Sequence, residues 1–185
     1  SEDAIINYKN AIKLNPKLFQ AHSNLGNILK ELDKPEEAKA CYLQALELNP
    51  NLAEVHSNLG NVFKDLKKLQ KAEASYLHAL ELNPNLAEAH SNLGDIFKEL
   101  GKLQEAEASC LKAIELNPNL AEAHNNLGVT YKELGRLQEA EASCLKAIEL
   151  NPNLAEAHIG LGIILKELNK LNEAKLSLEK AIKLK

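Results

Sequence analysis

Neutral hydrogen-bonding side chains recur along this 185-residue chain at a fixed spacing. Asparagines recur with a constant period of 34, at Asn24, Asn58, Asn92 and Asn126, and Gly160 stands at the fifth place. One position before these asparagines stand further polar residues, Ser23, Ser57, Ser91 and Asn125. Three positions after the first three asparagines stand Asn27, Asn61 and Asp95. A carboxamide donates and accepts, so it can pair with both the N–H and the C=O of an extended peptide. The pattern predicts a surface that holds a peptide backbone.

Histidines and cysteines do not form a reactive or metal-binding centre in this pattern. Five of the six histidines recur at the same period: His22, His56, His90, His124 and His158. Equivalent places on neighbouring helices lie about 8–10 Å apart, whereas zinc needs ligand nitrogens about 2 Å from the ion. The cysteines are odd in number and lack a Cys-x-x-Cys pair, which argues against disulfides and zinc knuckles. We therefore expect no catalytic residue, no metal and no cofactor.

The elements that must position these side chains follow from the prolines. Five Asn-Pro pairs share the period of the asparagines and end at Pro16, Pro50, Pro84, Pro118 and Pro152. A fixed period of this length is the signature of a repeat architecture. It divides the chain into a partial unit 1–18, full units 19–52, 53–86, 87–120 and 121–154, and a near-complete unit 155–185.

Each full unit has the apolar spacing of two helices. In unit 87–120 the first helix would bury Leu93, Gly94 and Phe97, and the second would bury Ala106 and Cys110. Gly101 would end this first helix in a left-handed conformation. Gly135 and Asn169 stand at the matching places of the next two units and would do the same. The residue before proline is pushed out of the helical region, so Asn-Pro ends the second helix. Each unit is predicted to be an antiparallel helix pair.

These residues carry a family resemblance that covers the whole chain. The pattern in unit 53–86 resembles the tetratricopeptide repeat (TPR), on the following residues: Leu59, Gly60, Phe63, Ala72, Tyr76, Ala79 and Pro84. The resemblance implies an all-α TPR solenoid, a right-handed superhelix of antiparallel helix pairs, whose first helices line a concave groove. It also implies a non-enzymatic module that binds a protein or peptide.

A narrower resemblance concerns the asparagines. The series Asn24, Asn58, Asn92 and Asn126 is similar to the asparagine ladder in the superhelical TPR domain of O-GlcNAc transferases. That similarity implies a groove for an extended or disordered segment. Two alternatives stay open: the same face is solvated or braces neighbouring helices, and the array is a structural scaffold without a groove ligand.

Toward the last units the same face becomes apolar, at Val129, Ile159 and Ile163. One interpretation is a pocket for an apolar anchor of the ligand, and the other is a surface covered by further protein. Part of the apolar strip Leu171, Ala174, Leu178 and Ile182 is also expected to be exposed, so self-association through uncapped ends is a further expectation.

Charge and hydropathy exclude several partners. The chain has 22 basic and 26 acidic residues, a net charge of −4 and no basic run, which disfavours nucleic acid. No stretch approaches 18 consecutive apolar residues, which argues against a membrane span. Three cysteines without a disulfide pattern favour a reducing compartment, so a cytoplasmic location is expected.

Overall fold

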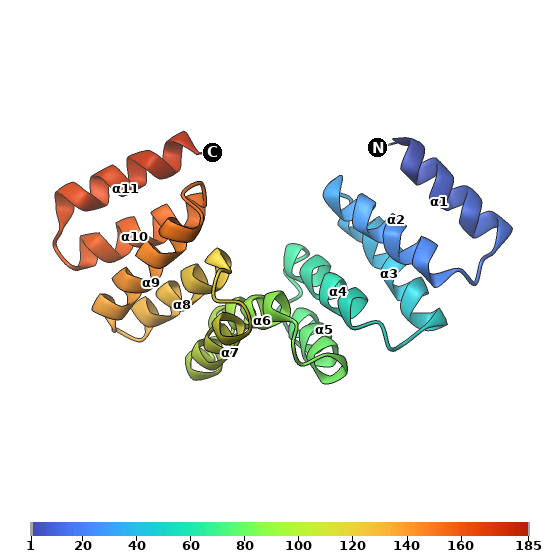
Figure 1. Ribbon diagram of the computed structural model, residues 1–185, viewed down its shortest axis with the longest axis horizontal. Helices are drawn as coiled ribbons and strands as arrows, with labels where there is room; N and C mark the ends of the chain where they lie inside the picture. The colour runs from blue at the N-terminus through green and yellow to red at the C-terminus, as the bar shows by residue number, and fades with distance from the viewer. Residues whose placement is uncertain (1, 185) are drawn as a thin grey trace. The chain divides into compact units, whose positions relative to one another are not determined.

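The computed structural model describes residues 2–184, and this range is all-α, as the repeat period predicts (Figure 1). The helices are α1 (Glu2–Leu14), α2 (Phe19–Glu31), α3 (Pro35–Leu48), α4 (Ala53–Asp65), α5 (Leu69–Leu82), α6 (Ala87–Glu99), α7 (Leu103–Leu116), α8 (Ala121–Glu133), α9 (Leu137–Leu150), α10 (Ala155–Glu167) and α11 (Leu171–Lys183). They form two compact units, the first ending at Asn85 and the second beginning at Leu86. Each unit is described by itself.

A left-handed residue ends every first helix of a pair. Gly101 and Gly135 have φ of 74° and 76°, and Asn169 has φ of 61°, which confirms the three predicted stops. Asp33 and Lys67 adopt the same conformation, with φ of 55° and 56°, although side chains other than glycine seldom do so. The following amide then reaches back across the last turn, as Arg136 N–H does to the Tyr131 carbonyl at 2.9 Å.

The Asn-Pro pairs end the second helices. Asn49 is extended, with φ of −144°, and its Oδ1 accepts the N–H of Asn51 at 3.1 Å. This Asx turn recurs after α5, α7 and α9, where Asn83, Asn117 and Asn151 are equally extended. The next first helix begins shortly after each turn.

The recurring histidines secure this turn. His56 Nε2 lies 2.9 Å from the Pro50 carbonyl, and His124 Nε2 lies 2.9 Å from the Pro118 carbonyl. His22 and His158 make the same contact, at 3.1 and 3.0 Å. A histidine at this place therefore ties the start of a first helix to the preceding loop, which is a structural role.

Small residues let the two helices of a pair approach each other closely, so the buried layer between them is thin. In the first unit, a Cβ on Gly26 would lie 2.7 Å from the Tyr42 ring. In the second unit, a Cβ on Gly128 would lie 2.5 Å from Cys144 Sγ, so a side chain is excluded there. Around these contacts lie thin layers of Leu, Ala and Ile, one cluster in each unit.

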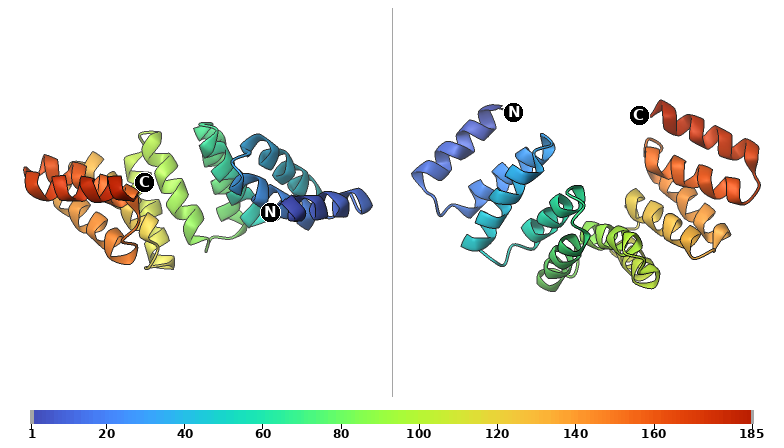
Figure 2. Two further views of the ribbon diagram at one scale, coloured as in Figure 1. Left: turned by 90° about the horizontal axis from the view of Figure 1, so that it is seen from above. Right: turned by 180° about the vertical axis from the view of Figure 1, so that it is seen from behind.

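Within the second unit, α8, α9, α10 and α11 follow one another in sequence order in the front and back views, and each contacts the next (Figures 1 and 2). Part of the apolar strip on α11 is exposed, as expected. Leu171 and Ile182 are 59% and 75% exposed, but Ala174 is 4% exposed because its own first helix, α10, covers it. Ala174 is thus the buried part of the strip, because an alanine at this place faces its own pair.

Candidate functional site

The first helices of consecutive pairs are neighbours within each unit. Helix α2 contacts α4 in the first unit, and α8 contacts both α6 and α10 in the second. The side of these helices that carries the asparagines, serines and apolar residues predicted as binding residues is what we call the first-helix face; Ser91 and Asn125 are buried beneath it. Each unit presents its own part of this face.

In the first unit, the amide of Asn27 is engaged by two neighbours. Its Oδ1 accepts the Tyr42 hydroxyl at 2.7 Å and the Nδ2 of Asn58 at 3.1 Å. Tyr76 repeats the first contact, because its hydroxyl donates to Asn61 Oδ1 at 2.6 Å. Burial raises the pKa of Tyr42, so this hydroxyl stays a donor. Asn58 thus braces α4 against α2 through its amide nitrogen.

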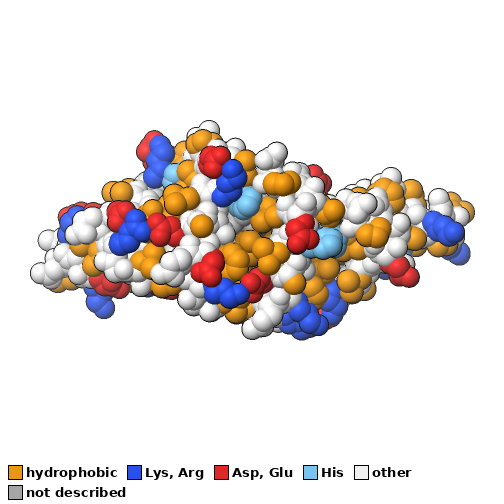
Figure 3. All heavy atoms as spheres, turned by 90° about the horizontal axis from the view of Figure 1, so that it is seen from below, with side chains coloured by type: hydrophobic (Ala, Val, Ile, Leu, Met, Phe, Trp, Pro, Cys, Tyr) orange, Lys and Arg blue, Asp and Glu red, His pale blue; other side chains and the backbone are white. Residues whose placement is uncertain are grey.

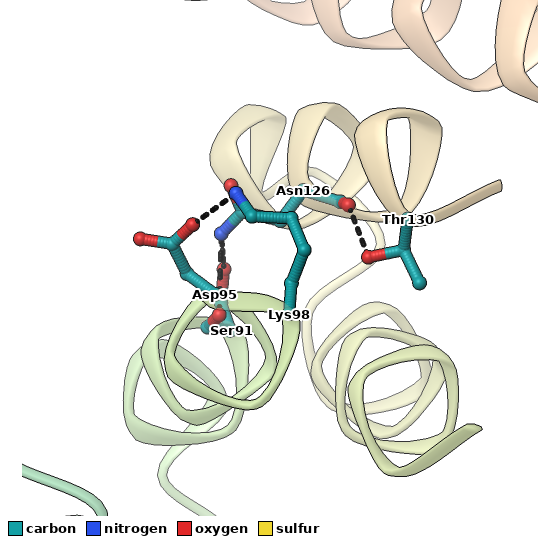
Figure 4. Close-up of polar contacts among 5 residues, drawn as sticks. All are labelled: Ser91, Asp95, Lys98, Asn126 and Thr130. Carbon is teal, nitrogen blue, oxygen red and sulfur yellow. Dashed lines mark hydrogen bonds and ion pairs between the residues drawn. The ribbon is translucent and has the colours of Figure 1, made fainter. Parts of the chain in front are cut away.

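In the second unit, Asn126 makes the equivalent brace with different partners (Figure 4). Its Nδ2 donates to the Ser91 carbonyl and to Ser91 Oγ, both at 3.2 Å. Ser91 is only 2% exposed, so it supports the face from beneath. Asp95 lies beside Ser91 and forms an ion pair with Lys98 at 2.6 Å. Asp95 is the one carboxylate among the predicted polar binding residues, and this pair neutralises its charge.

The braces leave one side of each amide unused. Asn58 and Asn126 donate through Nδ2, and within residues 2–184 their Oδ1 atoms accept no hydrogen bond. A carboxamide held by its nitrogen presents its oxygen in a fixed orientation, with no further ordering required when a donor arrives. The face can therefore accept N–H groups at two prepared positions, one in each unit.

Two hollows lie beside the other two asparagines. In the first unit a hollow of about 380 Å³ is lined by Ser23, Asn24 and Glu54, among others. In the second unit a hollow of about 240 Å³ is lined by Ser91, Asn92 and Glu122, among others. Ser57, predicted at the same register, is half-buried on α4 and lines neither hollow. Both hollows are shallow and have a mixed polar and apolar lining, suited to side chains of an extended segment rather than to an enclosed small molecule.

The face changes where Gly160 replaces asparagine. Asn125 is 9% exposed, and its buried Oδ1 has no hydrogen-bond partner within residues 2–184. A Cβ on Gly160 would lie 3.5 Å from this oxygen, so α10 lacks the side chain that would donate to it. Val129 and Ile159 are half-buried nearby and Ile163 is exposed, which makes this part of the face apolar.

Burial disfavours the thiolate form of two of the cysteines. Burial raises the pKa of the Cys110 thiol and of the Cys144 thiol to about 12, so both are protonated at neutral pH. Among residues 2–184 no group of three or more His, Cys, Asp or Glu side chains is arranged to hold a metal ion. No helix within the same range is long and apolar enough to cross a membrane.

Ion pairs between consecutive second helices were missed by the sequence analysis. Arg136 binds Glu107 at 2.7 Å and Lys170 binds Glu141 at 2.6 Å, and the two pairs have the same separation in sequence. Arg136 also stacks on the Tyr131 ring at 4.1 Å. The recurrence of a basic residue at a fixed distance after an acid could have revealed them. Oppositely charged side chains also lie close together on the face drawn in Figure 3, which matches the mild net charge.

Comparisons with known proteins agree with this architecture. A family model described as the cilia and flagella-associated protein 70 C-terminal domain, a TPR-related family, matches residues 1–185. No curated protein matches the chain. The fold is similar to that of YrrB, described as a TPR protein with an unusual peptide-binding site: identity is 26%, TM-score 0.71, and 96% of this chain and 92% of YrrB are covered.

Two further solved structures share the fold alone. TTC0263, a thermophilic TPR protein of Thermus thermophilus, is 23% identical with a TM-score of 0.77, covering 90% of this chain and 91% of its own. A chain of the APC/C hetero-tetramer Cut9–Hcn1 is 17% identical with a TM-score of 0.91, covering 99% of this chain and 36% of its own. The predicted TPR solenoid is thereby confirmed.

Proposed function

The chain belongs to the cilia and flagella-associated protein 70 C-terminal domain family, and from that premise we propose that it is a non-enzymatic module that binds an extended protein segment on its first-helix face. TPR folds serve protein–protein interaction. The ligand in this proposal is a peptide backbone, held by neutral amides instead of by a charge cluster. No nucleic acid is involved, because the net charge is −4 and no basic patch is present in the sequence.

One observation carries the proposal. Asn58 and Asn126 are each fixed through Nδ2 to a neighbouring helix while their Oδ1 atoms accept nothing within residues 2–184. A peptide N–H is the simplest donor for such an oxygen. The hollows beside Asn24 and Asn92 would then receive side chains that flank the bound backbone. YrrB, similar in fold, is itself described as having a peptide-binding site, which supports the same role here.

The apolar part of the face is proposed to hold a hydrophobic anchor of the same segment. Val129, Ile159 and Ile163 lie together where the asparagine series stops. Ile159→Asn with Ile163→Asn should weaken binding of a segment that ends in an apolar side chain. An all-polar segment of the same length should keep its affinity.

The experiment uses a displayed library of short linear peptides, selected on the full chain and then measured as free peptides. Asn126→Ala should weaken a selected peptide about tenfold, which corresponds to roughly 1.4 kcal/mol for one lost hydrogen bond. Ser91→Ala is the matched control, because it removes a partner of the brace but keeps Asn126 Oδ1. Gln138→Ala, an exposed change on α9, controls for the remaining surface.

A second candidate is supported by the same braces. If Asn58 and Asn126 serve only to hold first helices together, the chain is a scaffold without a ligand on this face. In that case no library peptide should be enriched, or enriched peptides should bind the double variant Asn58→Ala with Asn126→Ala as tightly as the native chain. Either result would refute the peptide-binding proposal.

A further inference from the structure

Two histidines of the first unit meet between the helices of one pair, α4 and α5. The ring centres of His56 and His78 lie 4.2 Å apart, and the planes of the rings are tilted by 39°. His78 lies outside the periodic histidine series, so the repeat spacing could not predict this contact. Neutral imidazole is the commonest metal ligand in proteins, so the ring nitrogens that keep a lone pair decide what the two rings can bind.

The polar partners of the two rings determine which nitrogens keep a lone pair. His56 Nε2 lies 2.9 Å from the Pro50 carbonyl. A carbonyl only accepts, so Nε2 carries the proton and Nδ1 keeps its lone pair. Burial lowers the pKa of His56, which favours this neutral ring. His78 Nδ1 lies 3.8 Å from Glu81 Oε2, and a proton held on Nδ1 by this carboxylate leaves the lone pair on Nε2.

The same partners are those that orient histidine ligands around a metal ion. A ligating histidine usually donates its second ring N–H to a backbone carbonyl or to a carboxylate, which fixes the tautomer and the direction of the ring. The Pro50 carbonyl stands behind His56, and the Glu81 carboxylate stands behind His78. Both rings therefore have the outer partner that a metal ligand needs.

The separation of the rings favours one class of ion. Two imidazoles that bind an ion at a right angle, each through a nitrogen about 2 Å away, have ring centres about 4.5 Å apart. At the tetrahedral angle that zinc favours, the same distance is about 5.2 Å. The observed 4.2 Å is closer to the first value, and the His78 side chain is half exposed, so it has room to adjust. Right-angled nitrogen and oxygen ligands are typical of Cu²⁺ and Ni²⁺.

We propose that His56 and His78 form a two-histidine site for a divalent transition-metal ion of tetragonal preference, Cu²⁺ or Ni²⁺. His56 binds through Nδ1 and His78 through Nε2. Water fills the remaining positions, because within residues 2–184 no third His, Cys, Asp or Glu completes a metal-binding group. The site includes none of the residues proposed to bind a peptide, so the two proposals are tested independently.

The second unit contains the same arrangement with one histidine missing. His124 contacts the Pro118 carbonyl at 2.9 Å, as His56 contacts Pro50. The place of His78 is taken by Lys146, which pairs with Glu149 at 2.8 Å as the equivalent of Glu81. A protonated lysine offers no lone pair, so His124 has no second ligand there. Lys146→His should therefore create a second site.

The test titrates Cu²⁺ into the full chain, followed by calorimetry and by electron paramagnetic resonance. The native chain should bind one ion with two imidazole nitrogens. His78→Lys installs the residue found at the equivalent place of the second unit, so the fold is kept, and binding should weaken more than tenfold with a single imidazole left. Glu81→Gln should weaken binding about tenfold, the usual effect of losing an outer partner. His124→Ala, the matched control that loses an equivalent loop contact, should change nothing.

Three results would overturn the proposal. The first is a His78→Lys chain that binds Cu²⁺ as tightly as the native chain. The second is a native spectrum with only one imidazole nitrogen on the ion. The third is a Lys146→His chain that still binds one ion, because the same set of partners would then not be sufficient for a site.

Discussion

Two glycines in the second unit should respond to alanine in opposite directions, although both lie in first helices. Alanine favours a helix interior over glycine by about 1 kcal/mol, and this gain applies to Gly128 in α8 and to Gly160 in α10. The surroundings differ. A Cβ on Gly128 would lie 2.5 Å from Cys144 Sγ and 3.1 Å from the Ala140 carbonyl. The nearest atoms to a Cβ on Gly160 lie at 3.4–3.6 Å, an ordinary contact.

The magnitudes follow from these distances. Forcing a methyl group into a closely packed contact costs about 1–3 kcal/mol, which offsets or exceeds the helical gain at Gly128. Gly160→Ala keeps the gain. The free energy of unfolding should therefore be about 1–3 kcal/mol higher for Gly160→Ala than for Gly128→Ala, or several degrees in melting temperature.

Thermal and urea unfolding, followed by circular dichroism, would measure the difference. A double-mutant cycle identifies its cause: Cys144→Ala removes the sulfur, so Gly128→Ala should cost less in that background. The relief should be incomplete, because the Ala140 carbonyl remains 3.1 Å away. If Gly128→Ala proves as stable as Gly160→Ala, the close approach of α8 and α9 is not what excludes a side chain there.

Two substitutions test single contacts, and the titration of one buried thiol gives a further prediction. Tyr42→Phe should lower the free energy of unfolding by about 1 kcal/mol, because Asn27 loses its 2.7 Å hydroxyl donor; chemical denaturation would detect it. Gly160→Asn should supply the missing donor to Asn125 Oδ1 and stabilise the second unit, and in an Asn125→Ala background this gain should disappear. Burial raises the pKa of the Cys144 thiol to about 12 in the folded chain, above the ordinary thiol value of about 8.5. The protonated thiol therefore contributes its full stabilisation of the fold below about pH 8, and this contribution is lost as pH rises toward 12. Labelling of this thiol at mildly alkaline pH should accordingly accelerate in urea, and rapid labelling of the folded chain would contradict its burial.

The helices could be predicted from the sequence because their ends are marked by residue types with fixed backbone preferences. Asn117 before Pro118 and Gly101 after a first helix leave few conformations to choose from. Lys67 could not be predicted as a left-handed stop, because its side chain has no such preference. There the period of the repeat, and not the residue, determines the turn.

The contacts among the candidate binding residues were harder to predict, because they join positions assigned to separate roles. Tyr42 stands at the repeat position where Cys110 was expected to be buried, and Asn27 was predicted on the binding face, yet they share a hydrogen bond. The sequence did contain the information, because the residue type at one position of the second helix changes together with the residue type at one position of the first helix. Tyrosine on the second helix accompanies asparagine on the first in the units of Asn27 and Asn61, and cysteine replaces tyrosine where Asp95 replaces asparagine. Side-chain pairs across a helix pair have to be read together for this reason.

The braces also change how the asparagine series must be tested. Asn126 uses its nitrogen for stability and, in our proposal, its oxygen for ligand, so alanine removes both functions and cannot separate them. Asn126→Asp separates them, because the carboxylate keeps an acceptor for a peptide N–H but cannot donate to Ser91. A variant that is destabilised yet still binds its peptide would assign the oxygen to the ligand and the nitrogen to the fold. Equal loss of both would place the whole amide in the brace, and the polar face would then be a surface property of helix packing.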